Sequence, residues 1–235
     1  PGAGAVNAMA DLYSDIAALR AEMCRVGRSL FERGYVHATA GNISVRLPAE
    51  VGGGYLITPT DACLGFLDPD QLAWVGEDGV QRSGARASKT LALHRQIYAA
   101  APEARCVIHT HSTHLVALSL QPGEPGASLL PPITPYFVMK VGQVPRIAYH
   151  RPGDPRVGEH VAREIARARA EGRSLRAVMV ERLGPNVWES TPAAAMAALE
   201  ELEETARLWL LSQPRPQPLD AAQLQELREH FNAPW

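Results

Sequence analysis

The sequence lacks the long hydrophobic runs and the cysteine pattern of membrane and secreted proteins. No apolar run approaches the roughly 20 residues that a helix needs to cross a bilayer. Residues 1–8 contain neither a cationic nor an apolar stretch, so we expect no secretory signal peptide. The cysteines are few and scattered: Cys24, Cys63 and Cys106. An odd, scattered set forms no disulfide framework, which favours a reducing compartment and a cytoplasmic protein.

The sequence also lacks an excess of charge of either sign. Lys and Arg total 23 and Asp and Glu total 25, which gives a formal charge of −2. This balance argues against nucleic acid or a membrane surface as a partner, but it is compatible with a local basic pocket for a small anion. Apolar residues make up 46% and charged residues 20% of the 235, as in a folded protein of one large domain or two small ones.

Interleaved helical and extended patterns predict one α/β layered domain over residues 1–212. Its first helix is expected from about Met9 to Arg33, with Asn7 as the cap. Other helices are expected at 89–101, 113–120 and 155–171, and a long one is expected to run to about residue 212 with Ser190 or Thr191 as its cap. Strands are expected at 55–58, 105–110 and 177–180, and a hairpin at 72–82. Residues 121–135 are expected to form a loop. Residues 213–235 are a Pro-rich linker and a last helix that is capped by Asp220 and could pack on another subunit.

Two histidines are the strongest local signal. His109 and His111 stand two residues apart on an expected strand, so their side chains point to the same face. Two imidazoles on one face are a ready pair of ligands for zinc or a similar divalent ion. The alternative is a pair that only forms hydrogen bonds in a polar cavity. His114 is open to three interpretations: a third ligand, a group that orients a ligand, or a plain surface or capping histidine.

Three segments have the composition of anion-binding loops. Gly41 to Ser44 combines a glycine with short polar side chains. Residues 58–61 place hydroxyl groups directly after a strand, and Ser88 and Lys89 stand just before a helix, where free N–H groups suit a phosphate. Each segment taken alone also fits an ordinary turn or helix cap. The polar loops 134–136 and 149–154 could line a cleft, although spacing alone favours a structural role.

Taken in order, these segments resemble the class II aldolase/adducin family over about residues 10–212. The resemblance rests on an ordered set of motifs: Gly41-Asn42-Ile43-Ser44, Tyr55 to Thr60, Ser88-Lys89 before a helix, His109-Thr110-His111, and Leu183-Gly184-Pro185 before a long helix. Within the family, the sequence is more similar to the 3-oxo-tetronate 4-phosphate decarboxylase branch. That similarity rests on residues 58–65, 88–94, 134–142 and 149–154.

The resemblance implies a three-layer α/β/α sandwich around a central, mainly antiparallel sheet. It also implies a homotetramer with active sites at subunit interfaces, where Tyr136 would reach across to a neighbouring subunit. His109 and His111 would bind one Zn²⁺, or another divalent metal, per subunit. A small phosphorylated sugar acid would be the substrate, and its phosphate would be held by Gly41, Asn42, Thr60, Ser88 and Lys89.

Thr90 departs from the family pattern in a chemically informative way. Aldolase members carry a catalytic glutamate at this position, and aldol cleavage needs such a base to remove a hydroxyl proton. A 3-oxo acid that loses CO₂ starts as a carboxylate, so it needs an electron sink and then a proton donor instead. Thr90 is therefore compatible with decarboxylation and awkward for aldol cleavage.

Leu183 is the second departure, because the family places its third zinc histidine there. Leucine cannot coordinate a metal, and catalytic zinc usually keeps three protein ligands. If residues 177–183 form one strand, Glu181 shares a face with Leu183 and could reach the metal. His114, His150, a water or the oxygens of the substrate are the other candidates.

These observations predict a metal-dependent decarboxylase that converts a 3-oxo-tetronate 4-phosphate into dihydroxyacetone phosphate and CO₂. His150 or Tyr136 would supply the proton. A class II sugar-phosphate aldolase or epimerase is one alternative, and Thr90 counts against it. A catalytically silent, adducin-like binding module is another. Leu183 supports that alternative, whereas the retained histidine pair and phosphate-type loops count against it.

Overall fold

The structure, a computed structural model, describes residue 13 and residues 15–235, and its centre is one eight-stranded sheet. The strand order is β4-β3-β2-β1-β5-β8-β7-β6. Neighbouring strands run antiparallel except for β6 and β7, which are parallel. The strands are β1 Asn42–Arg46, β2 Tyr55–Ile57, β3 Ala73–Val75, β4 Gln81–Ser83, β5 Cys106–His109, β6 Arg146–Ile147, β7 Ala177–Val180 and β8 Gly184–Glu189.

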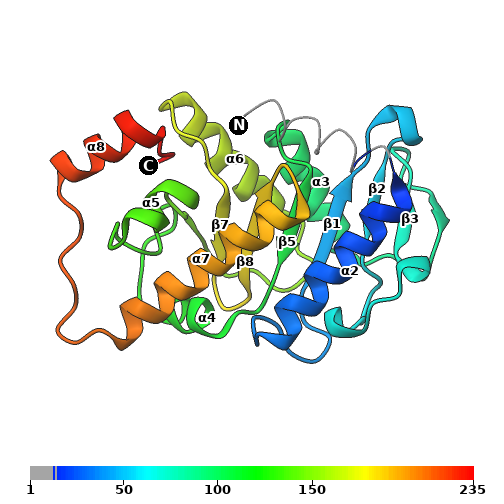
Figure 1. Ribbon diagram of the computed structural model, residues 1–235, viewed down its shortest axis with the longest axis horizontal. Coiled ribbons are helices and arrows are strands. Elements are labelled where there is room, and N and C mark those ends of the chain that lie inside the picture. The colour runs from blue at the N-terminus through cyan, green and yellow to red at the C-terminus, as the bar shows by residue number, and fades with distance from the viewer. Residues whose placement is uncertain (1–12, 14) are drawn as a thin grey trace.

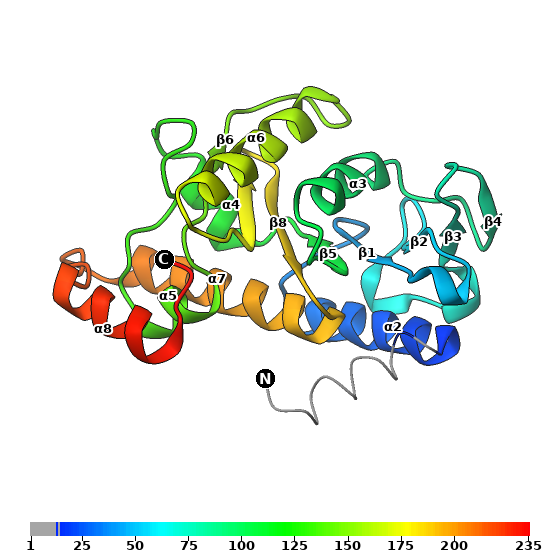
Figure 2. The same cartoon turned by 90° about the horizontal axis from the view of Figure 1, so that it is seen from above.

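Helices cover both faces of this sheet, as the view from above shows (Figure 2). On one face lie α2 (Ile16–Glu32) and α7 (Pro192–Leu211), and on the other lie α3 (Leu91–Ala100) and α6 (Arg156–Ala170). Side chains alternate along β5, so Ile108 packs on the α2 and α7 side while Val107 packs on the α3 and α6 side. The predicted three-layer α/β/α sandwich with a mainly antiparallel sheet is confirmed.

The first helix whose start the structure describes is α2. Asp15 adopts an extended backbone, and its carboxylate accepts hydrogen bonds from the N–H groups of Ala17 and Ala18, so α2 starts at Ile16. The predicted cap Asn7 and the predicted start at Met9 lie outside the described residues.

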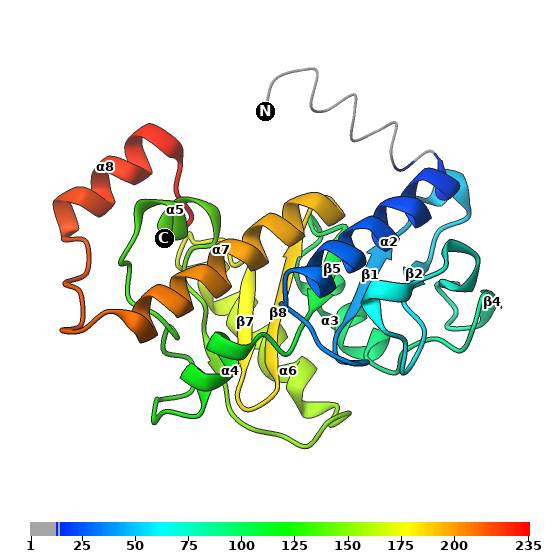
Figure 3. The same ribbon diagram turned by 60° about the horizontal axis from the view of Figure 1, so that its bottom comes forward.

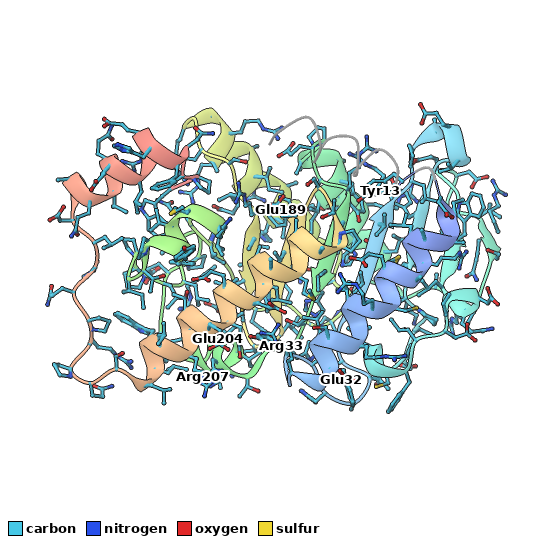
Figure 4. The ribbon with its side chains drawn as sticks, in the orientation of Figure 1. Tyr13, Glu32, Arg33, Glu189, Glu204 and Arg207 are labelled. Atoms are coloured by element: carbon cyan, nitrogen blue, oxygen red, sulfur yellow. The ribbon has the colours of Figure 1, made fainter. Side chains whose placement is uncertain are left out.

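The two long helices α2 and α7 are joined by polar contacts at the end of α2 (Figure 4). Arg33 pairs with Glu200, and the Tyr35 hydroxyl donates to Oε1 of Glu204 over 3.1 Å. At the N-terminal end of α7, Thr191 accepts a hydrogen bond from the Ala194 N–H, which confirms one of the two predicted caps. These contacts fix the layer that lies opposite α3 and α6.

Two short helices follow the central strand β5. The first is α4 (Thr113–Ser119), at the predicted place. The second, α5 (Pro135–Lys140), begins where the sequence predicts only loop. Thr134 accepts a hydrogen bond from the Phe137 N–H, and Pro135 occupies the first turn, where its missing N–H costs nothing. The segment 134–136 is therefore a helix start, and that part of the loop prediction was wrong.

The C-terminal helix α8 (Ala221–Phe231) packs against α5 of the same chain (Figures 1 and 3). Asp220 caps it as predicted, and the Phe137 and Trp235 rings meet edge to face at 5.6 Å. The predicted division of the chain at residue 212 stays a prediction. Among the described residues, no helix is both long and apolar enough to span a bilayer.

Candidate active site

A cavity of about 520 Å³ lies on the α3 and α6 side of the sheet, where β5 ends. Its walls come from the loops before β1, after β2 and before α3, and from the loop between β6 and α6. Seven residues that the sequence singles out line this one cavity: Gly41, Asn42, Thr60, Ser88, Lys89, His109 and His111. The fold therefore brings together the predicted metal ligands and the predicted phosphate-binding residues.

His109 lies in the middle of a polar row across three strands. In the sheet register it stands opposite Asn42 of β1 on one side and Asn186 of β8 on the other. Residues directly opposite each other share one face of a sheet, so all three side chains belong to the cavity face. The carbonyl of Pro185 can only accept, so Nδ1 of His109 must donate to it across their 2.8 Å contact. That hydrogen bond leaves Nε2 as a lone pair available to a metal.

His111 lies beside His109, and their ring centroids are 5.0 Å apart. The pKa of His109 is lowered to about 4 by two causes together, of which burial is the larger and the neighbouring His111 the smaller. The pKa of His111 is also lowered, mainly by burial and then by His37, whose ring centroid is 6.5 Å away. Both imidazoles are therefore neutral near pH 7, which is the state that binds metal.

The histidine pair fits a divalent metal, although it needs further ligands. With metal–nitrogen bonds of about 2.1 Å, two imidazoles that share one ion have ring centres roughly 5 Å apart, as His109 and His111 do. Oδ1 of Asn42, beside His109, is buried without a hydrogen-bond partner among the described residues. Within the same part of the chain, no group of three or more His, Cys, Asp or Glu side chains is placed to hold a metal.

Glu181 does not take the place of the missing histidine. β7 ends at Val180, and Arg182 has a φ of 63°, so residues 177–183 do not form the continuous strand that the sequence interpretation required. Oε1 of Glu181 instead accepts from Nε of the buried Arg146 over 3.0 Å. Leu183 itself lines the cavity.

His114 is also committed elsewhere. Its Nδ1 lies 2.8 Å from Oε1 of Glu203, a buried carboxylate on α7. The same carboxylate accepts the N–H groups of His114 and Leu115 at the start of α4. His114 therefore belongs to a helix-capping contact and does not line the cavity.

Hydrogen bonds tie the three phosphate-type segments to one another. The Ile43 N–H donates to the Thr58 hydroxyl over 3.2 Å, and the Ser88 N–H donates to the Thr58 carbonyl over 3.3 Å. Gly41 has a φ of 87°, and a Cβ there would lie 2.7 Å from the His109 carbonyl oxygen. Only glycine fits this close approach, which brings the loop before β1 against β5, the strand that carries His109.

His94, which the sequence analysis did not select, lies on α3 and is completely buried. Nδ1 of His94 lies 2.7 Å from Oγ of Ser44, and that Oγ lies 2.8 Å from the Tyr98 hydroxyl. Because the Tyr98 hydroxyl donates to the Ser44 carbonyl, the chain of donors runs from His94 to Ser44 to Tyr98. Nε2 of His94 is then an acceptor, without a partner among the described residues.

His150 and Tyr136, the predicted proton donors, do not line the cavity of the single chain. Nδ1 of His150 lies 4.0 Å from Oδ2 of Asp154, and its ring stacks on His160 at 5.1 Å. Tyr136 lies on α5 and is 61% exposed. The neighbouring Arg151 does line the cavity, in agreement with the alternative that the loop 149–154 lines a cleft.

A mainly antiparallel sheet between helix layers, with a histidine pair and anion-type loops at one cavity, defines a class II aldolase-type protein. The chain belongs to the class II aldolase and adducin family. The family model described as Class II Aldolase and Adducin N-terminal domain matches residues 21–210.

Two relatives share most of their length with this chain. The chain is 52% identical to the 3-oxo-tetronate 4-phosphate decarboxylase of Cupriavidus necator, over 92% of this chain and 97% of the relative. It is 39% identical to the protein of the same name from Escherichia coli, over 94% of this chain and all of the relative.

Solved structures agree with this assignment. YgbL from Escherichia coli superimposes with a TM-score of 0.82 at 38% identity, covering 91% of this chain and 99% of YgbL. An L-fuculose 1-phosphate aldolase superimposes with a TM-score of 0.76 at 22% identity, covering 91% of this chain and 96% of the aldolase, and this likeness shows the fold alone. The predicted family, and the similarity to its decarboxylase branch, are confirmed.

Proposed function

We propose that this protein is a metal-dependent decarboxylase that converts a 3-oxo-tetronate 4-phosphate into dihydroxyacetone phosphate and CO₂. The observation that carries the proposal is the single cavity that gathers the histidine pair and the anion-type loops. The names of the relatives supply the substrate, because both are called 3-oxo-tetronate 4-phosphate decarboxylase.

Each part of the cavity has a proposed role. His109, through Nε2, and His111 would hold one Zn²⁺ or another divalent ion per subunit, and that ion would stabilise negative charge on the C3 oxygen of the substrate. Lys89 and the start of α3 provide positive charge and donors for a phosphate. The phosphate would be held by Gly41, Asn42, Thr60, Ser88 and Lys89.

The chemistry of decarboxylation agrees with what stands at residue 90. The bond between C1 and C2 breaks, CO₂ leaves, and its electron pair forms an enolate between C2 and C3. A proton then adds to C2 and gives the ketone. No step removes a proton from the substrate, so no base is needed where Thr90 borders the cavity.

We propose Tyr136 from a neighbouring subunit of a homotetramer as the proton donor. Its exposure on α5 leaves the hydroxyl free to enter a neighbour's cavity. His150 is the second candidate, although its ring is engaged with Asp154 and His160.

A silent binding module is the competing function, and Leu183 in the cavity wall is the observation that favours it. Metal content and turnover separate the two. We expect the purified protein to hold about one divalent ion per subunit and to release CO₂ and dihydroxyacetone phosphate from the 3-oxo acid phosphate. His109→Ala should lose both properties and keep its circular dichroism spectrum. A parent protein that neither binds metal nor turns over this substrate would establish the silent module instead.

A further inference from the structure

Asn186 is a polar side chain in the cavity wall in which neither polar group has a described hydrogen-bond partner. It is 1% exposed, and both Oδ1 and Nδ2 are buried without a hydrogen-bond partner in the part of the chain that the structure describes. A buried amide with neither group paired is costly, so such a side chain is expected to meet a partner that the chain does not itself supply.

The place of Asn186 indicates which partner that is. It stands directly opposite His109 in the pairing of β8 with β5, and it lines the same cavity. Directly opposite residues on one face have Cβ atoms about 4.5–5.5 Å apart. An amide oxygen and an imidazole Nε2 at that separation can converge on a single ion. His109 is held in the tautomer that presents Nε2, because its Nδ1 donates to Pro185.

We propose that Oδ1 of Asn186 is the third protein ligand of the metal held by His109 and His111. It would take the role of the family's third histidine, whose position is occupied here by Leu183. The inference rests on the proposed metal-dependent function. Asn186 follows Leu183 by three residues in the chain. Gly184 allows the close turn between them, because its φ is 146° and a Cβ there would overlap the Thr110 carbonyl oxygen.

This ligand set has consequences for the ion. Two imidazoles and an amide oxygen are all neutral, so the metal keeps its full double charge toward the substrate oxygen. An amide oxygen is a harder ligand than imidazole. Compared with a three-histidine site, this ligand set should therefore raise the affinity for Mn²⁺ relative to that for Zn²⁺. Nδ2 of Asn186 remains a donor beside the metal, available to an oxygen of the substrate.

The test compares metal affinity and the stability of the metal-free protein in matched variants. Asn186→Val removes both polar groups at similar volume. We expect it to weaken Mn²⁺ and Co²⁺ binding at least tenfold in titration calorimetry and to leave the metal-free melting temperature unchanged or higher. Asn186→Asp should restore binding, because it keeps the oxygen ligand. Thr205→Val, a buried polar residue on α7 that is bonded within its own helix, should leave affinity unchanged.

The Co²⁺ absorption spectrum supplies a second readout, because it reports the ligands directly. We expect the Asn186→Val spectrum to differ from that of the parent protein. Equal metal affinity and equal spectra in the parent and in Asn186→Val would overturn the proposal. It would also be overturned if His37→Ala lost metal affinity while Asn186→Val kept it. A parent protein that binds no divalent ion would contradict the proposed function itself, which is a distinguishable result.

Discussion

At the scale of single residues, ring nitrogens decide what the buried histidines can do. His109 donates Nδ1 to a carbonyl and keeps Nε2 for a ligand, whereas His94 donates Nδ1 into a chain of hydroxyl groups. Burial, and to a smaller extent the nearby His109, lowers the pKa of His94 to about 3. Both residues are held neutral by the interior around them.

This burial predicts an acid-sensitive free energy of unfolding. An unfolded histidine titrates near pH 6.5 and His94 near 3, so between these values the unfolded chain binds more protons. Stability is therefore fully present above about pH 6.5 and falls as the pH drops toward 3. At pH 5, His94 alone should account for a loss of about 2 kcal/mol relative to pH 7.5.

Urea unfolding at a series of pH values measures this loss, and imidazole NMR assigns it. The His94 ring signals should stay those of a neutral ring with a proton on Nδ1 down to pH 5. Titration of these signals near pH 6.5 would show that the ring is reached by water and would contradict the prediction.

Residue patterns predicted the histidine pair but not the asparagine beside it. His109 and His111 could be predicted as a pair from their two-residue spacing. The strand itself ends at His109, so His111 follows it outside the sheet, and the prediction that both lie on one strand was wrong. Asn186 has no such local signal. It becomes a site residue only because β8 pairs with β5 in a register that places it opposite His109.

At the scale of elements, the carboxylate of Glu203 on α7 caps the N-terminus of another helix, α4. Glu203 accepts from the N–H groups of His114 and Leu115 over 2.9 and 3.0 Å, at the beginning of α4. Those N–H groups have no partner within their own helix. Because α4 starts two residues after His111, this contact also anchors the short segment between β5 and α4 that carries His111.

Removal of this carboxylate should destabilise the protein. Glu203→Ala leaves two buried N–H groups unpaired, and we expect a loss of about 2–4 kcal/mol in the free energy of unfolding. Glu203→Gln keeps one acceptor and should lose less. Chemical denaturation measures both. Glu229→Ala, on the exposed face of α8, is the control and should change stability by less than about 0.5 kcal/mol. Equal stability of Glu203→Ala and this control would exclude the capping role.

Element boundaries were predictable where capping chemistry is local. Thr191 and Asp220 cap helices as expected, and β7 has the predicted bounds Ala177–Val180. The two-residue strand β6 was not predicted, because a strand this short carries no periodicity and exists only through its pairing with β7.

At the scale of the whole molecule, the cavity of one chain lacks a proton donor from the predicted pair. Tyr136 lies exposed on α5, and His150 is turned toward Asp154. In the proposed homotetramer, a cavity becomes complete only when a neighbour contributes Tyr136. A shared site of this kind has a testable consequence for mixed assemblies.

Two inactive variants should restore activity when they are mixed. Tyr136→Phe and His109→Ala are each expected to lose nearly all turnover. If subunits exchange at random, about one site in four of an equal mixture combines an intact histidine pair with an intact neighbouring tyrosine. The mixture should therefore recover about a quarter of the parent rate after co-refolding. Light scattering should give the mass of a tetramer. No recovery from a confirmed mixed tetramer would assign the proton donor to the same chain.

The sequence by itself determined the layered α/β class, the family and the candidate ligands, because these depend on local periodicity, caps and short ordered motifs. Only the tertiary structure decided which candidates share a site. It joined Ser88 and Thr60 to the histidine pair, committed Glu181 to Arg146 and His114 to Glu203, and placed Asn186 beside His109. The physical reason is that these relations depend on strand register and helix packing between residues far apart in the chain, which local sequence does not encode.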